Sequence, residues 1–172
     1  MTTTLDIQDL ILQTDASGAP VRLEYVRGRL KVEASPASRH QKTSRRIERT
    51  IAPIPGAGDG CACFAIADTL IRFSDLDGSL KRPDIAIFCE EPPDSDEALD
   101  VLPQAVIEIL SVGYEEKDLG EDGAPFYLAF GIEVLVVDPR KHVAHHYRPG
   151  EPLARLALPV TIDLVCGCCV AL

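Results

Sequence analysis

Two short aliphatic segments of the chain each contain a single carboxylate. Asp84 lies within the segment 81–88, Lys-Arg-Pro-Asp-Ile-Ala-Ile-Phe, and Glu108 lies within the segment 105–111, Ala-Val-Ile-Glu-Ile-Leu-Ser. Runs of this kind, bounded by proline, serine or charge, predict buried strands. An ionised carboxylate among apolar neighbours loses several kcal/mol of hydration unless a positive group compensates for it. One divalent cation bound through oxygen by two adjacent strands would compensate, and so would an arginine beside each acid.

The charge distribution limits the classes of partner. The chain has 172 residues and a formal net charge of −10, which argues against a general nucleic-acid binder because phosphate contacts require Lys and Arg. Residues 1–50 nevertheless hold nine Lys and Arg against six Asp and Glu, whereas residues 51–172 hold eight against twenty-one. The N-terminal segment is therefore compatible with a local phosphate-facing patch. The length predicts a single domain, 1–172.

The cellular compartment is inferred from what the sequence lacks. No apolar run approaches the ~20 residues of a membrane span, and the first residues, Met-Thr-Thr-Thr-Leu-Asp, do not resemble a secretory signal. We therefore expect a cytoplasmic protein whose six cysteines are reduced thiols. Cys61-x-Cys63 and Cys166-x-Cys168 are more closely spaced than structural zinc pairs and lie in apolar runs, which favours small hydrophobic residues over zinc ligands.

Periodicity and turn residues predict an α/β chain. Helices are expected over 5–12, from Ser38 onward and around 125–130, and a hairpin over 22–33 with its turn at Arg27-Gly28. One bent strand is expected over 61–73, followed by an Asp-Gly turn at 77–78 that leads to the Asp84 strand. Further strands are expected over 132–137, 142–147 and 153–165.

The helix that begins at Ser38 has a basic surface. Ser38 followed by Gln41 fits a capping box, and His40 in the first turn is interpreted as a packing or capping residue. The basic side chains are Arg39, Lys42, Arg45, Arg46 and Arg49. They form either an ordinary solvated face or a set of phosphate contacts.

Several short motifs occur in an order that resembles a known family. They are Ser35-Pro-Ala-Ser-Arg-His-Gln41, Arg82-Pro-Asp-Ile-Ala-Ile87, Ile107-Glu-Ile-Leu-Ser111, Asp118-x-Gly-Glu121, Tyr127-x₃-Gly-Ile132 and Val137-Asp-Pro139. Together with the hairpin they resemble the Uma2 family of the PD-(D/E)XK nuclease-like superfamily, over roughly Glu24 to Tyr147. The resemblance implies a restriction-endonuclease-like core, in which helices flank a mixed central β-sheet and an N-terminal β-hairpin is added.

The resemblance also implies roles for particular residues. Asp84 and Glu108 would be ligands of Mg²⁺ or Mn²⁺, and the backbone carbonyl of Ile109 would complete the inner shell. Such a site hydrolyses phosphodiesters by lowering the pKa of a bound water and neutralising charge on the phosphate. Glu24 and His40 match family positions near the acids and are accessory candidates.

One departure from the family pattern concerns the catalytic lysine. The superfamily places a lysine near the second acid, where it stabilises the transition state. The strict pattern would put it two residues after Glu108, where Leu110 stands, and the family's usual alternative would put it at 122, where the chain has Asp122. Lys117 is the nearest amine in the sequence and becomes the candidate.

Two functional hypotheses follow from these residues. The first is a Mg²⁺-dependent endonuclease that cleaves DNA, with Asp84, Glu108 and Lys117 as catalytic residues and the basic helix facing phosphate. The second is a catalytically degenerate member that acts as a binding protein or homodimeric scaffold, in which the apolar segment 164–172 packs against a partner. Neither hypothesis involves a membrane.

Overall fold

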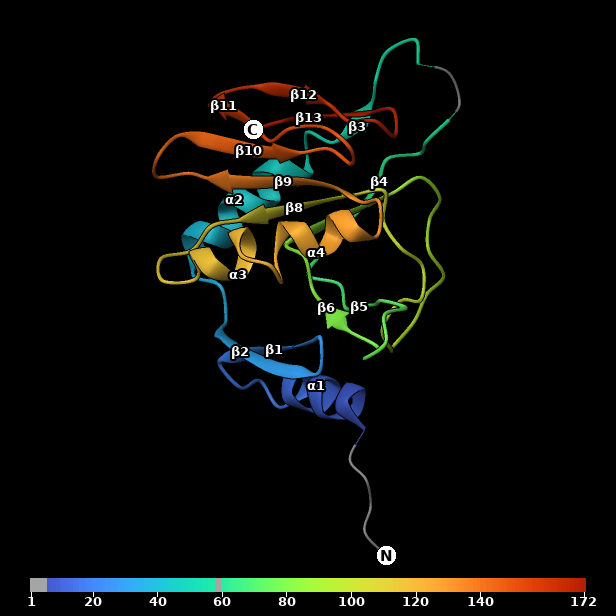
Figure 1. Ribbon diagram of the computed structural model, residues 1–172, viewed down its shortest axis with the longest axis vertical. Helices are drawn as coiled ribbons and strands as arrows, with labels where there is room; N and C mark the ends of the chain where they lie inside the picture. Colours follow the sequence, from blue (N-terminus) through green and yellow to red (C-terminus); the bar gives the residue numbers. More distant parts are fainter. Residues whose placement is uncertain (1–5, 58–59) are drawn as a thin grey trace, which may run out of the picture.

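A mixed six-stranded sheet forms the centre of the protein. The computed structural model describes residues 6–57 and 60–172, and in it the sheet has the order β11-β10-β9-β8-β7-β4 (Figure 1). Its strands are β4 (Phe64–Ala67), β7 (Ile85–Phe88), β8 (Ala105–Ile109), β9 (Glu133–Asp138), β10 (Val143–Tyr147) and β11 (Ala154–Ala157). β8 and β9 are parallel and the other neighbours are antiparallel. The two predicted carboxylate segments are therefore adjacent inner strands.

The alternation of side chains along these strands creates two apolar layers. Ala86, Val106 and Leu110 pack on one face, together with aromatic residues of helix α4 (Ala124–Ala129). Ile85 and Ile107 pack on the other face, against Ile47 of helix α2 (Ser38–Glu48). Because residues two apart share a face of a strand, Glu108 points into the first layer between Val106 and Leu110.

Two smaller sheets extend this core. One has the order β2-β1-β6-β5, built from β1 (Val21–Val26), β2 (Arg29–Ala34), β5 (Ile71–Arg72) and β6 (Leu80–Lys81), and helix α1 (Ile7–Ala16) packs on β1 (Figure 1). The other has the order β12-β13-β3, built from β3 (Ala52–Pro53), β12 (Thr161–Asp163) and β13 (Cys168–Ala171). The short helix α3 (Glu115–Leu119) lies between β8 and α4 in the chain.

The structure confirms most predicted elements and corrects several of them. The hairpin turn is at Arg27-Gly28, where both residues have positive φ, 50° and 77°. Helix α1 is longer than the predicted 5–12. The bent strand predicted over 61–73 is wrong: it divides into β4 and β5 of different sheets, with Asp68 at positive φ between them.

The capping box predicted for α2 is also wrong. Ala37 occupies the N-cap position and makes no side-chain cap hydrogen bond. Instead, the side-chain amide of Gln41 donates to the carbonyl of Pro36 at 3.2 Å. The helix begins at Ser38, one residue earlier than a Ser38 cap would require.

The prediction that all six cysteines are reduced thiols is wrong for four of them. Cys61 is bonded to Cys89, and Cys63 to Cys168, whereas Cys166 and Cys169 are free. The pairing of β4 with β7 brings the residues before β4 beside Cys89, and β13 supplies Cys168. Sequence spacing could not reveal this convergence, since the bonded residues come from separate segments.

Within 6–57 and 60–172, no helix is both long enough and apolar enough to cross a membrane.

Candidate active site

Asp84 and Glu108 meet across the pair β7 and β8. Asp84 directly precedes β7, and the antiparallel register that pairs Ile85 with Ile107 places it opposite Glu108. The amide of Asp84 donates to Oε2 of Glu108 at 3.1 Å, and the amide of Ile109 donates to Oδ2 of Asp84 at 2.6 Å. Each carboxylate is thus positioned by the backbone beside the other.

Glu108 is the more deeply buried of the two acids. Its side chain is 1% exposed, and its Oε1 accepts a hydrogen bond from the hydroxyl of Tyr127 at 2.9 Å. Burial, followed by the charges of Asp118 and Asp84, raises the pKa of Glu108 well above its ordinary value. The neutral form is favoured because three carboxyl groups share a space with little water.

Asp118, on α3, is a third acid of the site and was not a candidate from the sequence. It is 5% exposed and lines the same cleft as Asp84. Burial and the charge of Asp84 raise its pKa to about 7, although Lys117 opposes the shift. The available signal was its place in the Asp-x-Gly-Glu motif, which sequence reasoning used only to search for a lysine.

His40 approaches Asp84 from the first turn of α2. Its Nε2 lies 2.9 Å from Oδ2 of Asp84. Burial lowers the pKa of His40, but the hydrogen bond and charge of Asp84 and a backbone hydrogen bond with Ile109 raise it overall. The imidazole therefore contacts two of the predicted metal ligands, Asp84 and Ile109, rather than serving only as a helix cap.

Lys117, the candidate amine from the sequence, lines the same cleft as Asp84 and Asp118. Its Nζ is 2.9 Å from Oε1 of Glu33 and 4.0 Å from Oε1 of Glu24. Burial lowers the pKa of Lys117, but the charges of Glu24, Glu108 and Glu33 raise it well above its ordinary value. Lys117 is consequently a fixed cation near neutral pH and not a general base.

A second buried amine, Lys81, was missed by sequence reasoning. It is 1% exposed at the end of β6, and its Nζ lies 3.6 Å from Oε2 of Glu24 and donates to the carbonyl of Asp122 at 2.8 Å. Glu24 also accepts a hydrogen bond from the amide of Arg82 at 2.8 Å and is 2% exposed. No motif distinguished Lys81, because a Lys-Arg pair before a proline resembles an exposed turn.

Asp122 occupies the position at which the family pattern has a lysine. Its carboxylate forms ion pairs with Lys31 at 2.5 Å, Arg29 at 3.0 Å and Arg27 at 3.6 Å, all on the hairpin. Burial raises the pKa of Asp122, but these cations lower it overall. The side chain does not line the cleft that contains Asp84, so position 122 faces the hairpin.

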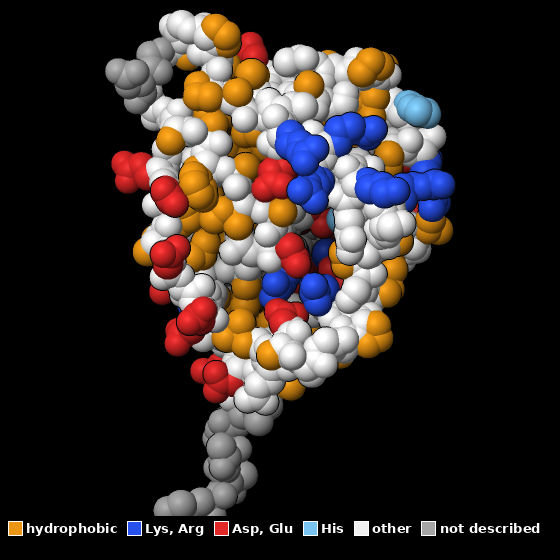
Figure 2. Space-filling view, turned by 180° about the vertical axis from the view of Figure 1, so that it is seen from behind, with side chains coloured by type: hydrophobic (Ala, Val, Ile, Leu, Met, Phe, Trp, Pro, Cys, Tyr) orange, Lys and Arg blue, Asp and Glu red, His pale blue; other side chains and the backbone are white. Residues whose placement is uncertain are grey.

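The site opens into a cleft of about 290 Å³. Asp84, Asp118, Lys117 and His40 line it, whereas Glu108 lies beneath its floor. Arg39 also lines the cleft, and an adjoining groove is lined by Arg45. Figure 2 shows basic side chains gathered beside a hollow in which acidic and basic groups are visible. The five predicted basic residues, Arg39, Lys42, Arg45, Arg46 and Arg49, are all exposed.

The donor set of the site suits a hard divalent cation. Carboxylate oxygens are the preferred ligands of Mg²⁺. Asp84 and Glu108 lie beside each other, and Asp118 lines the same cleft as Asp84. Glu24 is a further buried acid nearby, and it is compensated by cations: burial raises its pKa, but the charges of Lys117 and Lys81 lower it overall. Burial is the largest cause of the raised pKa values of Glu108 and Asp118, and the charge of Asp84 adds to it.

Comparisons with known proteins agree with this architecture. The model of the Uma2 family, described as "Putative restriction endonuclease", matches residues 7–164. Among solved structures, the chain is similar to a crystal structure described as that of "a putative nuclease belonging to DUF820 from Anabaena variabilis ATCC 29413", with a TM-score of 0.61, 17% identity, and coverage of 83% of this chain and 81% of that chain. No sequence match was found among curated proteins. The predicted restriction-endonuclease-like fold is confirmed.

Proposed function

Because this chain belongs to the Uma2 family, we propose that it is a Mg²⁺-dependent endonuclease that hydrolyses phosphodiester bonds in DNA. The observation that supports this most directly is that Asp84, which lies beside Glu108, lines one cleft together with Asp118 and a half-buried, protonated Lys117. Hydrolysis of a phosphodiester requires a cation, an activated water and stabilisation of the charge that develops on the phosphate.

The residues have distinct roles in this proposal. Asp84 and Asp118 hold Mg²⁺ (Mn²⁺ can replace it) at the cleft, with Glu108 and the carbonyl of Ile109 as the deeper donors. When bound, the metal lowers the pKa of a water molecule and neutralises phosphate charge. Lys117 remains cationic and stabilises negative charge on the phosphate, because its pKa is too high for it to accept a proton near neutral pH.

The surroundings of the site support DNA as the substrate. Arg39 lines the cleft and Arg45 the adjoining groove, so the basic face of α2 leads directly to the carboxylates. His40 and Glu24 act as accessory residues: His40 orients Asp84, and Glu24 holds Lys117 and Lys81 in place. The phosphates on either side of the scissile bond would contact the exposed basic side chains of α2.

A catalytically degenerate binding protein is the second candidate, and one observation favours it. The family's lysine position carries Asp122, whose carboxylate is paired with hairpin cations away from the cleft. The scaffold version of this hypothesis assigned the apolar segment 164–172 to a partner chain. That segment instead packs within its own chain, since β13 pairs with β12 and β3 and Val170 is fully buried.

Calorimetric titration of Mn²⁺ tests the metal site directly. Wild type is compared with Asp84→Asn and Glu108→Gln, which keep the side-chain shapes, and with Glu116→Gln, an exposed acid on α3. We expect saturable binding by wild type and Glu116→Gln and loss of binding in the two site variants. Unchanged Mn²⁺ affinity in both site variants would contradict the proposed site.

A cleavage assay separates the two candidate functions. Plasmid and single-stranded DNA are incubated with each protein in Mg²⁺ or in EDTA. The endonuclease proposal expects Mg²⁺-dependent cleavage that disappears in Asp84→Asn. Metal binding without cleavage of either substrate would favour the degenerate binding protein.

A further inference from the structure

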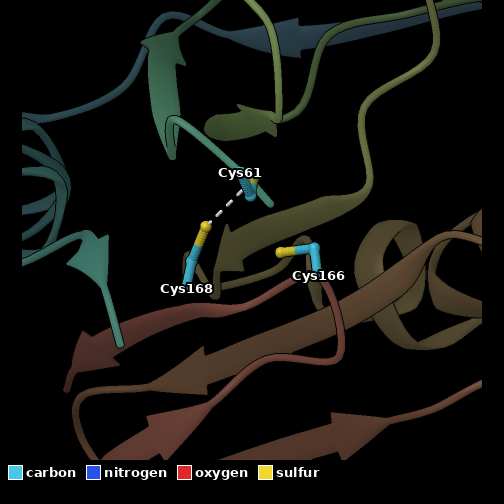
Figure 3. Close-up of side chains that lie close together, drawn as sticks. All are labelled: Cys61, Cys166 and Cys168. Atoms are coloured by element: carbon cyan, nitrogen blue, oxygen red, sulfur yellow. Dashed lines mark hydrogen bonds between the residues drawn. The ribbon is translucent and has the colours of Figure 1, made fainter. Parts of the chain in front are cut away.

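Three cysteine sulfurs converge at a place remote in the chain from the carboxylate site. The Sγ atoms of Cys61, Cys166 and Cys168 all lie within 4.8 Å of one another, and those of Cys61 and Cys168 are 3.4 Å apart (Figure 3). They come from the segment before β4, the turn before β13 and β13 itself. The fold brings the first of these segments beside the other two, although it lies far from them in the sequence.

The two disulfides add two further sulfurs to the same place. Cys89 is bonded to Cys61, and Cys63 is bonded to Cys168. Five of the six cysteines therefore belong to one cluster, which we call the sulfur cluster: Cys61, Cys63, Cys89, Cys166 and Cys168. Cys169 is the free cysteine outside it.

The spacing of the three sulfurs matches the requirement of a tetrahedral thiolate site. A Zn–S bond of about 2.3 Å places thiolate ligands about 3.8 Å apart along a tetrahedral edge. The separations in the cluster, from 3.4 Å to at most 4.8 Å, bracket that value. Thiolates are soft ligands that favour zinc over magnesium, so this cluster would not compete with the carboxylates for the same ion.

The backbone that carries Cys166 is held in position. The amide of Val165 donates to Oε2 of the buried Glu133 at 2.8 Å, and the amide of Gly167 donates to the carbonyl of Leu164 at 3.0 Å. Glu133 is itself fixed by Nε2 of His146 at 2.6 Å. These hydrogen bonds hold the turn so that the free thiol of Cys166 lies beside the sulfurs of Cys61 and Cys168.

We propose that the chain with both disulfides reduced binds one Zn²⁺ through Cys61, Cys166 and Cys168, with the fourth thiolate from Cys63 or Cys89. The reductant is a dithiol: two dithiol molecules transfer four electrons and four protons to the two disulfides, which gives four cysteine thiols and two oxidised dithiols. Binding of Zn²⁺ then releases one proton from each of the four ligating thiols. Oxidation of the chain to the two disulfides removes the site, because Cys61 is then bonded to Cys89 and Cys168 to Cys63.

The pairwise spacing that argued against zinc in the sequence does not apply to this arrangement. That argument treated Cys61-x-Cys63 and Cys166-x-Cys168 each as a local chelating pair. In the structure the three nearest sulfurs include one residue from the first pair and two from the second. The site is assembled by tertiary contacts, for which local spacing carries no information.

Cobalt titration of the reduced full-length chain tests this proposal. The protein is reduced with a phosphine under anaerobic conditions, and Co²⁺ is added while thiolate-to-cobalt charge-transfer absorption is recorded; Zn²⁺ is then added in competition. This absorption requires sulfur ligands, so binding at Asp84 and Glu108 does not contribute. Wild type is compared with Cys166→Ser, which leaves both disulfide pairs intact, and with the matched control Cys169→Ser.

We expect wild type and Cys169→Ser to bind one Co²⁺ per chain with thiolate absorption that Zn²⁺ abolishes. The affinity of Cys166→Ser for Co²⁺ should be lower than that of wild type by more than about 100-fold. Removal of an outer-shell contact to a metal site costs about 10–100-fold, and loss of a direct ligand should cost more. Circular dichroism of the metal-free reduced variants establishes that they are folded. Absence of thiolate absorption in reduced, folded wild type would overturn the proposal, and so would equal affinity in wild type and Cys166→Ser.

Discussion

Substitution of Asp118 by Asn should stabilise the metal-free protein. The pKa of Asp118 is raised from 3.8 to about 7 by burial and by Asp84. A carboxyl whose folded pKa exceeds its unfolded pKa makes the folded state lose stability as the pH rises between the two values. At about 1.4 kcal/mol per pKa unit, a shift of about three units lowers the free energy of unfolding of wild type by at most about 4 kcal/mol at high pH. The variant recovers less than this, because it also loses the attraction between Asp118 and Lys117.

The prediction has a specific dependence on pH. Near pH 4, where the carboxyl is mostly protonated when buried and only partly ionised when unfolded, wild type and Asp118→Asn should have similar free energies of unfolding. Near pH 8 the variant should be more stable, by up to about 4 kcal/mol. Urea unfolding in EDTA across this range measures the difference, with Glu116→Gln on the same helix as the exposed control.

Addition of metal should narrow this difference in stability. Saturating Mn²⁺ at about one hundred times its Kd stabilises a protein by about 2.7 kcal/mol, and we expect that gain in wild type but not in Asp118→Asn. Stability curves for the two proteins that remain parallel between about pH 4 and pH 8 would refute the charge argument. A variant that Mn²⁺ stabilises as strongly as wild type would refute the role of Asp118 as a ligand.

Three further predictions concern neighbouring groups. Lys117→Met should lower kcat for Mg²⁺-dependent DNA cleavage by about 10²–10³ without loss of Mn²⁺ binding; unchanged kcat would exclude Lys117 as the stabilising cation. Tyr127→Phe leaves a buried oxygen of Glu108 unpaired and should cost about 1–3 kcal/mol in urea unfolding, whereas Tyr147→Phe, whose hydroxyl has no hydrogen bond to the described residues, should cost less. Arg45→Ala should reduce the slope of log K against log salt for DNA binding by about 1, and an unchanged slope would remove Arg45 from the interface.

The central strands were predictable because their sequence signal is local and strong. The aliphatic runs around Asp84 and Glu108 are too apolar to be solvated segments, so they are predicted as buried strands. Within each strand, residues two apart lie on the same face, which predicts the apolar neighbours of each acid. The hairpin at Arg27-Gly28 was predictable for a similar reason, since glycine there adopts φ of 77° without steric cost. Both predictions depend on neighbours within a few residues.

The rest of the site depends on contacts between distant segments. Lys81 enters the site only because β6 pairs with β1, which places its amine beside Glu24. Cys61 and Cys168 are over one hundred residues apart yet have sulfurs 3.4 Å from each other. A single sequence contains no periodicity or spacing that records such pairings.

The position of Asp122 has a local structural cause that also defines the role of Lys117. Gly123 packs so closely on α3 that an added Cβ would lie 2.3 Å from the carbonyl of Asp118. Only glycine allows the backbone to approach α3 so closely at this position. The neighbouring Asp122 then has its carboxylate among the hairpin cations, and its backbone carbonyl accepts a hydrogen bond from the amine of Lys81. An amine at 122 would therefore face like charges on Arg29 and Lys31 instead of the cleft. Lys117, on α3, is instead an amine that lines the cleft beside Asp84 and Asp118, so the proposed cleavage would depend on it.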